Sequence, residues 1–181
     1  RVVIIDGDDS LSSVLTFDVS RTIRRFSIRD GMDVGLQPGR LLTTLNEGNV
    51  VGNNSPLTIA GNATLDGADL QIAGGGGVTV DQGVIDVGFL DLGEIAPPSS
   101  PIDHLTGRGS VTVQTNLRNS GTIASQGGLL EVTASSVDLD GSSGKGTIDV
   151  MPNSLLRVSA SISSTFNSDM SVSANAQAEF N

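Results

Sequence analysis

The sequence predicts an all-β protein, folded as a right-handed parallel β-solenoid of about seven coils, and three observations support this prediction. Short runs of alternating apolar and polar residues recur along the chain, and nearly every run ends at Gly, Asn or Asp. Similar phrases return about every 20 to 25 residues, as stacked repeat units require. No segment has the i, i+3, i+4 apolar spacing of an amphipathic helix.

The clearest repeat is the phrase GTI, which occupies 121–123 and returns at 146–148. Stacked coils place equivalent residues about 4.8 Å apart, so we expect Ile123 to lie on Ile148 in the core. Further inward positions follow from the alternation of each run: Val132, Leu139, Val150 and Val158.

Gly and Asn are expected at the corners between strands. Gly121 and Gly146 would stack at one corner, where a positive φ or a tight bend is needed. Asn62, Asn119 and Asn153 suit neighbouring corners, because Asn tolerates the left-handed region.

Composition describes a thin aliphatic core and an acidic surface. The 181 residues include 23 Gly and five Phe but no Cys, Trp or Tyr, which is too few aromatic residues for most enzymes of this size. Ten basic residues stand against 20 acidic ones, and this balance argues against a nucleic-acid partner. The lack of an apolar run near ~20 residues argues against membrane insertion. An acidic, Lys-poor, Cys-free chain indicates an extracellular or cell-surface location.

We expect one domain over 1–181, with regular coils over 51–93 and 108–181. Residues 1–50 alternate less cleanly and are interpreted as irregular early coils. Their candidate core residues are Val14, Phe17, Ile23, Phe26, Ile28, Met32, Val34, Leu36, Leu41 and Leu42. The segment 94–107 holds three prolines and is expected to be a loop or a seam between two solenoid segments, since proline does not fit a central strand.

Two long phrases, LTIAGNATLDGADLQIAGGGGVTVDQG at 57–83 and LTGRGSVTVQTNLRNSGTIASQGGLLEVTASSVDLDGSSGKGTIDVMPNSLLRVSA at 105–160, carry a resemblance. They resemble the degenerate repeats of large secreted bacterial surface proteins: autotransporter passengers, filamentous-haemagglutinin-like adhesins and the giant surface proteins of planctomycetes. The resemblance covers about residues 50–175 and rests on style, without a diagnostic motif. It implies a right-handed β-helix with an adhesive or scaffolding role, and it brings no catalytic residues.

Acidic residues supply two candidate sites. Asp6, Asp8 and Asp9 alternate as in a calcium loop but lack the rest of an EF-hand, so a solvated acidic turn is the alternative. Asp138 and Asp140 point outward from one strand, as an acid and base for polysaccharide cleavage would, or as plain surface residues. Other aspartates are expected to be scattered without a cluster: Asp66, Asp69, Asp86 and Asp91.

Three other features have a functional and a structural interpretation. His104 is the single histidine and is expected in a surface loop, because it has no partner for a metal site or a triad. The glycines of AGGGGV at 73–78 lack the Lys of a P-loop and predict a flexible corner. Arg21, Arg25 and Arg29 form the basic cluster, which fits an acidic polymer, ion pairing or plain surface.

These features predict a non-enzymatic structural or adhesive surface protein without a cofactor or metal. Its expected partners are further copies stacked end to end in a filament, or neighbouring coils of a longer parent chain, with a surface glycan as a further ligand. The alternative is a polysaccharide-binding or polysaccharide-degrading β-helix, although Trp and Tyr for stacking on sugars are absent. An ice-binding solenoid is a third class, but the threonines keep no common T-x-T spacing.

Overall fold

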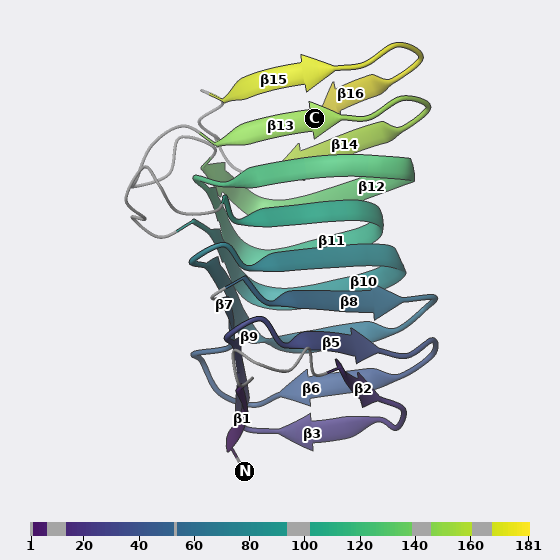
Figure 1. Ribbon diagram of the computed structural model, residues 1–181. Helices are drawn as coiled ribbons and strands as arrows, with labels where there is room; N and C mark the ends of the chain where they lie inside the picture. Colours follow the sequence, from purple (N-terminus) through teal and green to yellow (C-terminus); the bar gives the residue numbers. More distant parts are fainter. Residues whose placement is uncertain (1, 7–13, 53, 94–101, 139–145, 161–167) are drawn as a thin grey trace.

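The computed structural model describes residues 2–6, 14–52, 54–93, 102–138, 146–160 and 168–181. Every regular element in this part is a β-strand, and all the strand pairs are parallel. The strands stack as rungs from the N-terminal end, purple in Figure 1, to the C-terminal end, yellow. Paired residues on adjacent rungs lie about 18 to 27 positions apart in sequence, as the repeat spacing predicts.

The rungs form three faces, which we call A, B and C in the order in which the chain visits them from β2 onward. Face A consists of β2 (Val14–Phe17), β5 (Asp33–Leu36), β8 (Pro56–Ala60), the first parts of β10 (Gly77–Leu92), β11 (His104–Asn119) and β12 (Thr122–Asp138), then β13 (Thr147–Val150) and β15 (Asp169–Val172).

Face B consists of β3 (Arg21–Ile23), β6 (Leu41–Thr44), the first part of β9 (Thr64–Ala73), the middle of β10 to β12, then β14 (Leu155–Ala160) and β16 (Gln177–Phe180). Face C consists of β1 (Val2–Asp6), β4 (Arg25–Arg29), β7 (Val50–Gly52) and the last parts of β9 to β12. The fold is therefore a three-faced parallel β-solenoid.

The described residues give about six complete turns, each with strands on faces A, B and C. Two further turns, formed by β13 with β14 and by β15 with β16, are described on faces A and B only. The count of about seven coils from the sequence therefore differs slightly from the number of complete turns, and the fold class is confirmed.

Inward side chains form continuous aliphatic columns along the axis. On face A one column runs through Val34, Leu57, Val78, Leu105, Ile123 and Ile148, all 1% exposed or less. The predicted contact between Ile123 and Ile148 is confirmed, and Val132, Val150 and Val158 are buried as expected. Leu139 lies outside the described residues.

The first fifty residues pair on the same three faces as the later turns. The predicted core residues there are buried from Ile23 to Leu36 and at Leu42, and Phe17 packs against the core. Leu41 is the exception because it points outward and is 42% exposed. The side chain of Val14 is outside the described part.

The predicted loop over 94–107 extends too far toward its C-terminal end. Residues 94–101 lie outside the described part, but His104 begins β11 and continues face A, where it pairs in register with Gly77 and Thr122. The prediction of a loop or seam is therefore wrong for residues 104–107, and so is the prediction that His104 lies in a surface loop.

The corner residues differ in their physical role. Asn62 and Asn153 have φ near 59° and 58°, as predicted for the left-handed region. Asn119 does not have a positive φ and is instead buried, where its side-chain oxygen accepts a hydrogen bond from the Gly121 N–H at 3.1 Å. Gly121 and Gly146 also lack a positive φ, and they are needed because a Cβ would collide with the backbone of the rung below.

Candidate functional site

A groove runs along the corner between faces A and B over the last three turns. It has a volume of about 650 Å³ and is wide open to solvent. Equivalent positions on successive turns line it: Gly128, Leu129, Asn153, Ser154, Leu155, Asn175, Ala176 and Gln177. Asn153 and Asn175 have φ of 58° and 57°, so their backbone turns the corner in the same way on each rung. The groove presents amides and hydroxyls beside the half-exposed Leu129.

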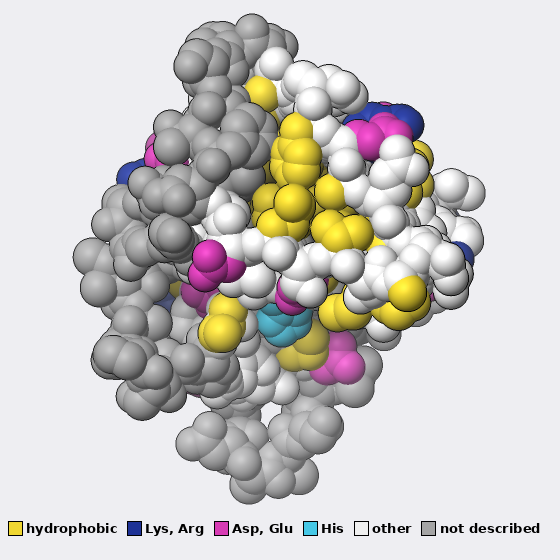
Figure 2. All heavy atoms as spheres, turned by 90° about the horizontal axis from the view of Figure 1, so that it is seen from above, with side chains coloured by type: hydrophobic (Ala, Val, Ile, Leu, Met, Phe, Trp, Pro, Cys, Tyr) yellow, Lys and Arg dark blue, Asp and Glu magenta, His cyan; other side chains and the backbone are white. Residues whose placement is uncertain are grey.

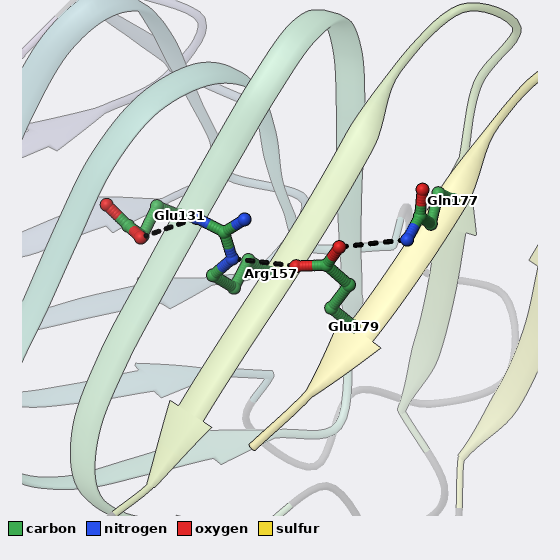
Figure 3. A network of polar contacts seen from close by, with 4 residues as sticks. All are labelled: Glu131, Arg157, Gln177 and Glu179. Atoms are coloured by element: carbon green, nitrogen blue, oxygen red, sulfur yellow. Dashed lines mark hydrogen bonds and ion pairs between the residues drawn. The ribbon is translucent and has the colours of Figure 1, made fainter.

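A row of charged side chains on face B borders this groove (Figure 3). Glu131, Arg157 and Glu179 occupy the same outward position on β12, β14 and β16. The Arg157 guanidinium bonds Glu179 through Nε at 2.8 Å and Glu131 through Nη1 at 3.3 Å. Gln177 donates its amide N–H to the other oxygen of Glu179 at 2.8 Å, which links the charged row to the groove.

These contacts decide what the charged row can do chemically. Hydrogen bonds to Glu179 and then to Glu131 raise the pKa of Arg157, so the guanidinium stays positive. Both carboxylates accept hydrogen bonds from Arg157, so the three side chains form one charge-paired row.

Of the predicted carboxylate pair Asp138 and Asp140, only Asp138, at the end of β12, is among the described residues. Asp138 continues an outward column of face C after Asp91 and Arg118, whereas Asp140 lies outside the described residues. Arg118 Nη1 lies 3.9 Å from a carboxylate oxygen of Asp91. Face A has a similar pair, in which Arg108 Nε donates to Asp81 at 2.9 Å. Each face therefore has an arginine beside an acid on the neighbouring rung.

The other aspartates are not simply scattered. Asp66 and Asp86 lie side by side on adjacent rungs of face B, and Asp86 accepts a hydrogen bond from Gln114 at 3.2 Å. Asp69 instead supports a corner, since its carboxylate accepts bonds from the N–H groups of Gly48 and Asn49 at 2.9 to 3.1 Å. Only the register between turns reveals which of these residues meet.

The glycines of AGGGGV form a corner that binds a carboxylate of the chain itself. Asp103 is 4% exposed, and its Oδ1 accepts hydrogen bonds from Gly75 N–H at 2.7 Å and Gly76 N–H at 3.1 Å. Gly74 and Gly75 have positive φ, a conformation in which successive N–H groups converge on an anion. Burial raises the pKa of Asp103, and these two hydrogen bonds act in the opposite direction. The N–H groups of this corner therefore hold the Asp103 side chain of the same chain, at the place where a P-loop would hold a phosphate.

His104 comes directly after Asp103 in the chain and lies on face A, where Gly77 is its neighbour on the adjacent rung. A side chain at Gly77 would collide with the imidazole, so the two residues fit as a small-and-large pair on adjacent rungs. Its Nδ1 lies 3.3 Å from the carbonyl oxygen of Ile102.

The predicted basic cluster is exposed at the N-terminal end of the solenoid. Arg21 lies on β3, and Arg25 and Arg29 lie on β4, with Arg29 Nε donating to Ser27 at 2.8 Å. No ion pair joins any of the three to another described residue.

The predicted calcium residues are mostly outside the described part. Asp6 ends β1, and Asp8 and Asp9 are not described. Within the described ranges, no three His, Asp or Glu side chains are grouped so that they could hold a metal ion. The same ranges contain no helix with the length and hydrophobicity needed to cross a membrane.

Sequence reasoning missed the groove and the charged row beside it. The signal that could have found them is the spacing of Glu131, Arg157 and Glu179, which lie 26 and 22 residues apart and therefore near one repeat. The three-faced geometry defines the chain as a parallel β-solenoid protein. No family model, curated protein or solved structure matches the chain.

Proposed function

We propose that the chain is a non-enzymatic structural and adhesive segment of an extracellular surface protein, in which the solenoid acts as a stiff rod. The observation that carries the proposal is the unbroken core: one aliphatic column passes through six consecutive turns from Val34 to Ile148 without a polar interruption. Close-packed columns resist bending because any bend opens gaps between the rungs. A rod of this kind holds a surface at a distance and presents its faces to partners.

The outward side chains support the same proposal. Arg108 on face A, Arg118 on face C and Arg157 on face B each pair with an acid on the neighbouring rung of the same face. These pairs are partly exposed, so each adds little stability, but together they put opposite charges side by side on each of the three faces. The acidic, Lys-poor composition supports an extracellular location for this surface.

A second candidate function is polysaccharide binding at the groove between faces A and B. The specific observation in its favour is the row of Asn153, Asn175 and Gln177 beside Leu129 and the Arg157 ion pairs. Amides, carboxylates and a guanidinium are the groups that hydrogen-bond sugar hydroxyls, and leucine covers the apolar side of a ring.

The experiment couples the purified chain to beads and measures their retention under flow on bacterial cell-wall polysaccharide and on glass. We expect greater retention than for beads that carry an unrelated acidic protein of similar size. We also expect no new reducing ends when the soluble chain is incubated with a polysaccharide panel. Equal retention of both kinds of bead, or release of reducing ends, would contradict the proposed function.

The second candidate is tested with the double variant Asn153→Ala and Gln177→Ala. Loss of polysaccharide binding in this variant, with binding preserved in Gln114→Ala on β11 outside the groove, supports the groove as the glycan site. Binding that is unchanged in both variants rejects that site.

A further inference from the structure

The corner between β8 and β9 carries an Asn-x-Thr sequence. It consists of Asn62, Ala63 and Thr64, and its middle residue is not proline. In secreted proteins this sequence accepts an N-linked oligosaccharide on the asparagine amide. Among the described residues, four asparagines have a positive φ, and only Asn62 of these has Thr or Ser two positions later. The turn therefore explains an asparagine at position 62, but it does not explain the threonine at position 64.

The fold leaves the Asn62 amide at the surface. Asn62 is exposed, whereas Ala63 is 0% exposed and fixes the corner to the core. Two hydrogen bonds hold the backbone of the corner, from the Asn62 N–H to the carbonyl oxygen of Gln82 at 2.8 Å and from the Ala63 N–H to that of Ala60 at 2.9 Å. The Asn62 side chain itself makes no hydrogen bond within the part of the chain that the structure describes. A substituent on its amide therefore costs the fold no native hydrogen bond.

The neighbouring rungs leave space for a glycan at this corner. Residues 37–40 on one side and Asp81 and Gln82 on the other are all exposed. The same division into an apolar centre and a polar periphery is seen at the C-terminal end, where hydrophobic side chains gather in the middle and polar side chains lie around them (Figure 2). A hydrated oligosaccharide on Asn62 therefore extends into solvent without displacing a neighbouring turn.

An apolar strip on face B lies beside the corner. Leu41 and Val84 flank Thr64 in one outward column, and Leu41 is 42% exposed. Two residues along a strand span about 6.6 Å, so this column lies within reach of the first sugar on Asn62. A sugar that covers Leu41 removes apolar surface from water, which is favourable. The corner therefore combines an acceptor amide with a surface that the first sugar contacts.

We propose that Asn62 is a site of N-linked glycosylation, with Thr64 as the residue that the modifying enzyme recognises. The donor is an oligosaccharide carried on a lipid pyrophosphate. Nδ2 of Asn62 forms a bond to the anomeric carbon of the first sugar, the bond from that carbon to the pyrophosphate oxygen breaks, and the amide loses one proton to a base of the enzyme. The inference rests on the extracellular location in the proposed function, and it adds a covalent modification to it.

A second sequence of this kind serves as an internal comparison. Asn53, Asn54 and Ser55 form an Asn-x-Ser sequence, but Asn53 lies outside the described residues. Ser55 is 0% exposed, and Pro56 follows it directly and restricts its backbone to extended conformations. Thr64 is instead half-buried in an outward column. The modification is therefore assigned to position 62.

The test expresses the full chain behind a cleavable secretion signal in a eukaryotic cell line that glycosylates its secreted proteins. We expect a mass above that of the polypeptide. An amidase that removes N-linked glycans should abolish this increase and leave aspartate at position 62 of the corresponding peptide. Asn62→Gln and Thr64→Ala should each lose the increase, whereas Thr64→Ser should keep it because the hydroxyl remains.

Asn153→Gln is the matched control, because Asn153 has a similar φ at the same corner of a later turn but has Leu155 two positions later. This variant should keep the mass increase. Gln is tolerated at such a corner, since Gln82 has a φ of 61° on the rung next to Asn62. A wild-type chain without a mass increase, sugar found only at Asn53, or an increase that Thr64→Ala retains would each overturn the proposal.

A separate measurement distinguishes failure of this inference from failure of the proposed function. Beads that carry the secreted wild-type chain and beads that carry secreted Asn62→Gln are compared in the flow assay. Retention of both kinds of bead, with no glycan on the wild-type chain, would reject the site and keep the rod function. A glycan at Asn62 on a chain that is not retained would reject the adhesive function and keep the site.

Discussion

Ile148 and Met170 are neighbours in one column of face A, yet the first is 1% exposed and the second 56%. Both follow the same alternation along their strands, so the local pattern assigns both to the core. The difference is that Ile148 has a rung on each side, whereas Met170 has a described rung on one side only. Burial in this protein is therefore supplied by stacking between turns as much as by the sequence of any one strand.

The central turns differ from the terminal turns in continuity as well. β10, β11 and β12 run for 16, 16 and 17 residues around all three faces, whereas β2, β3, β15 and β16 have three or four residues each. Bulges between Asp81 and Gly83, and between Gly107 and Gly109, let the long strands bend without ending. Central strands are thus held by neighbours that bend in the same places.

The largest expected effect comes from a charge placed inside the core column of face A that contains Ile148. Ile148→Asp should destabilise the protein by several kcal/mol and unfold the turns around it, because a buried carboxylate has no partner there. Met170→Asp, one rung away, should cost under ~1 kcal/mol, since the side chain is already exposed. Denaturant unfolding measures both variants. Equal losses would mean that the end of the column is as buried as its middle.

The next effect concerns a glycine inside a column. Gly107 has φ near 119°, and a Cβ at this position would collide with the carbonyl of Val80 on the rung below. Gly107→Ala should therefore cost about 2 kcal/mol or more. Gly35, on β5 nearer the N-terminal end, has open space where an alanine Cβ would lie, so Gly35→Ala should change stability by less than ~1 kcal/mol. Melting temperatures that rank the two variants in the opposite order would contradict this role of close stacking.

A smaller effect is a pH dependence of the free energy of unfolding, which arises at Asp103 in the glycine-rich corner. Burial raises the pKa of Asp103 above its usual 3.8, so the folded protein favours the protonated carboxyl more than the unfolded chain does. This group's stabilising contribution is complete below pH 3.8 and is lost as the pH rises through the raised pKa. Relative to Asp103→Asn, wild-type stability should therefore decrease as the pH rises from about 3 to 7.

The pH dependence is read from the difference in unfolding free energy between wild type and Asp103→Asn across that range. Asp81→Asn is the matched control, because Asp81 is an exposed partner of Arg108 and does not enter the corner. A difference between wild type and Asp103→Asn that stays constant with pH would rule out a raised pKa at Asp103.

The smallest expected effect comes from the ion pairs of Arg157 and Arg108. Arg157 contacts two carboxylates and Arg108 contacts one, so Arg157→Gln should cost more stability than Arg108→Gln, although both losses should be small because the pairs are partly exposed. Both losses should shrink at about 1 M salt because these charges are partly exposed. Thermal unfolding at low and high salt is the measurement. A loss that is larger for Arg108→Gln would reject the two-carboxylate explanation.

The fold was predictable because the solenoid depends on a periodic signal. Alternation identified the strands, and the repeated GTI phrase identified the stacking of Ile123 on Ile148. Residues 104–107 were assigned wrongly, since the prolines before them suggested a loop while the neighbouring rungs of face A hold this segment as a strand. Contacts between turns override the local signal there.

The groove and its charged row were not predictable in the same way. Glu131, Arg157 and Glu179 meet although the number of residues per turn varies, since it is 26 for the first step and 22 for the second. Asp103 was overlooked beside the more conspicuous His104, because nothing in the local sequence says that its carboxylate turns inward to Gly75 and Gly76.

The sequence by itself determined the strand-rich class, the repeat length, the aliphatic core and the acidic surface, because these depend on composition and on periodicity along the chain. Only the tertiary structure decided which outward residues face one another, which glycines are obligatory and which column ends are exposed. These features depend on the register between turns, and register arises from the packing of whole rungs, whose spacing in sequence varies from 18 to 27 residues.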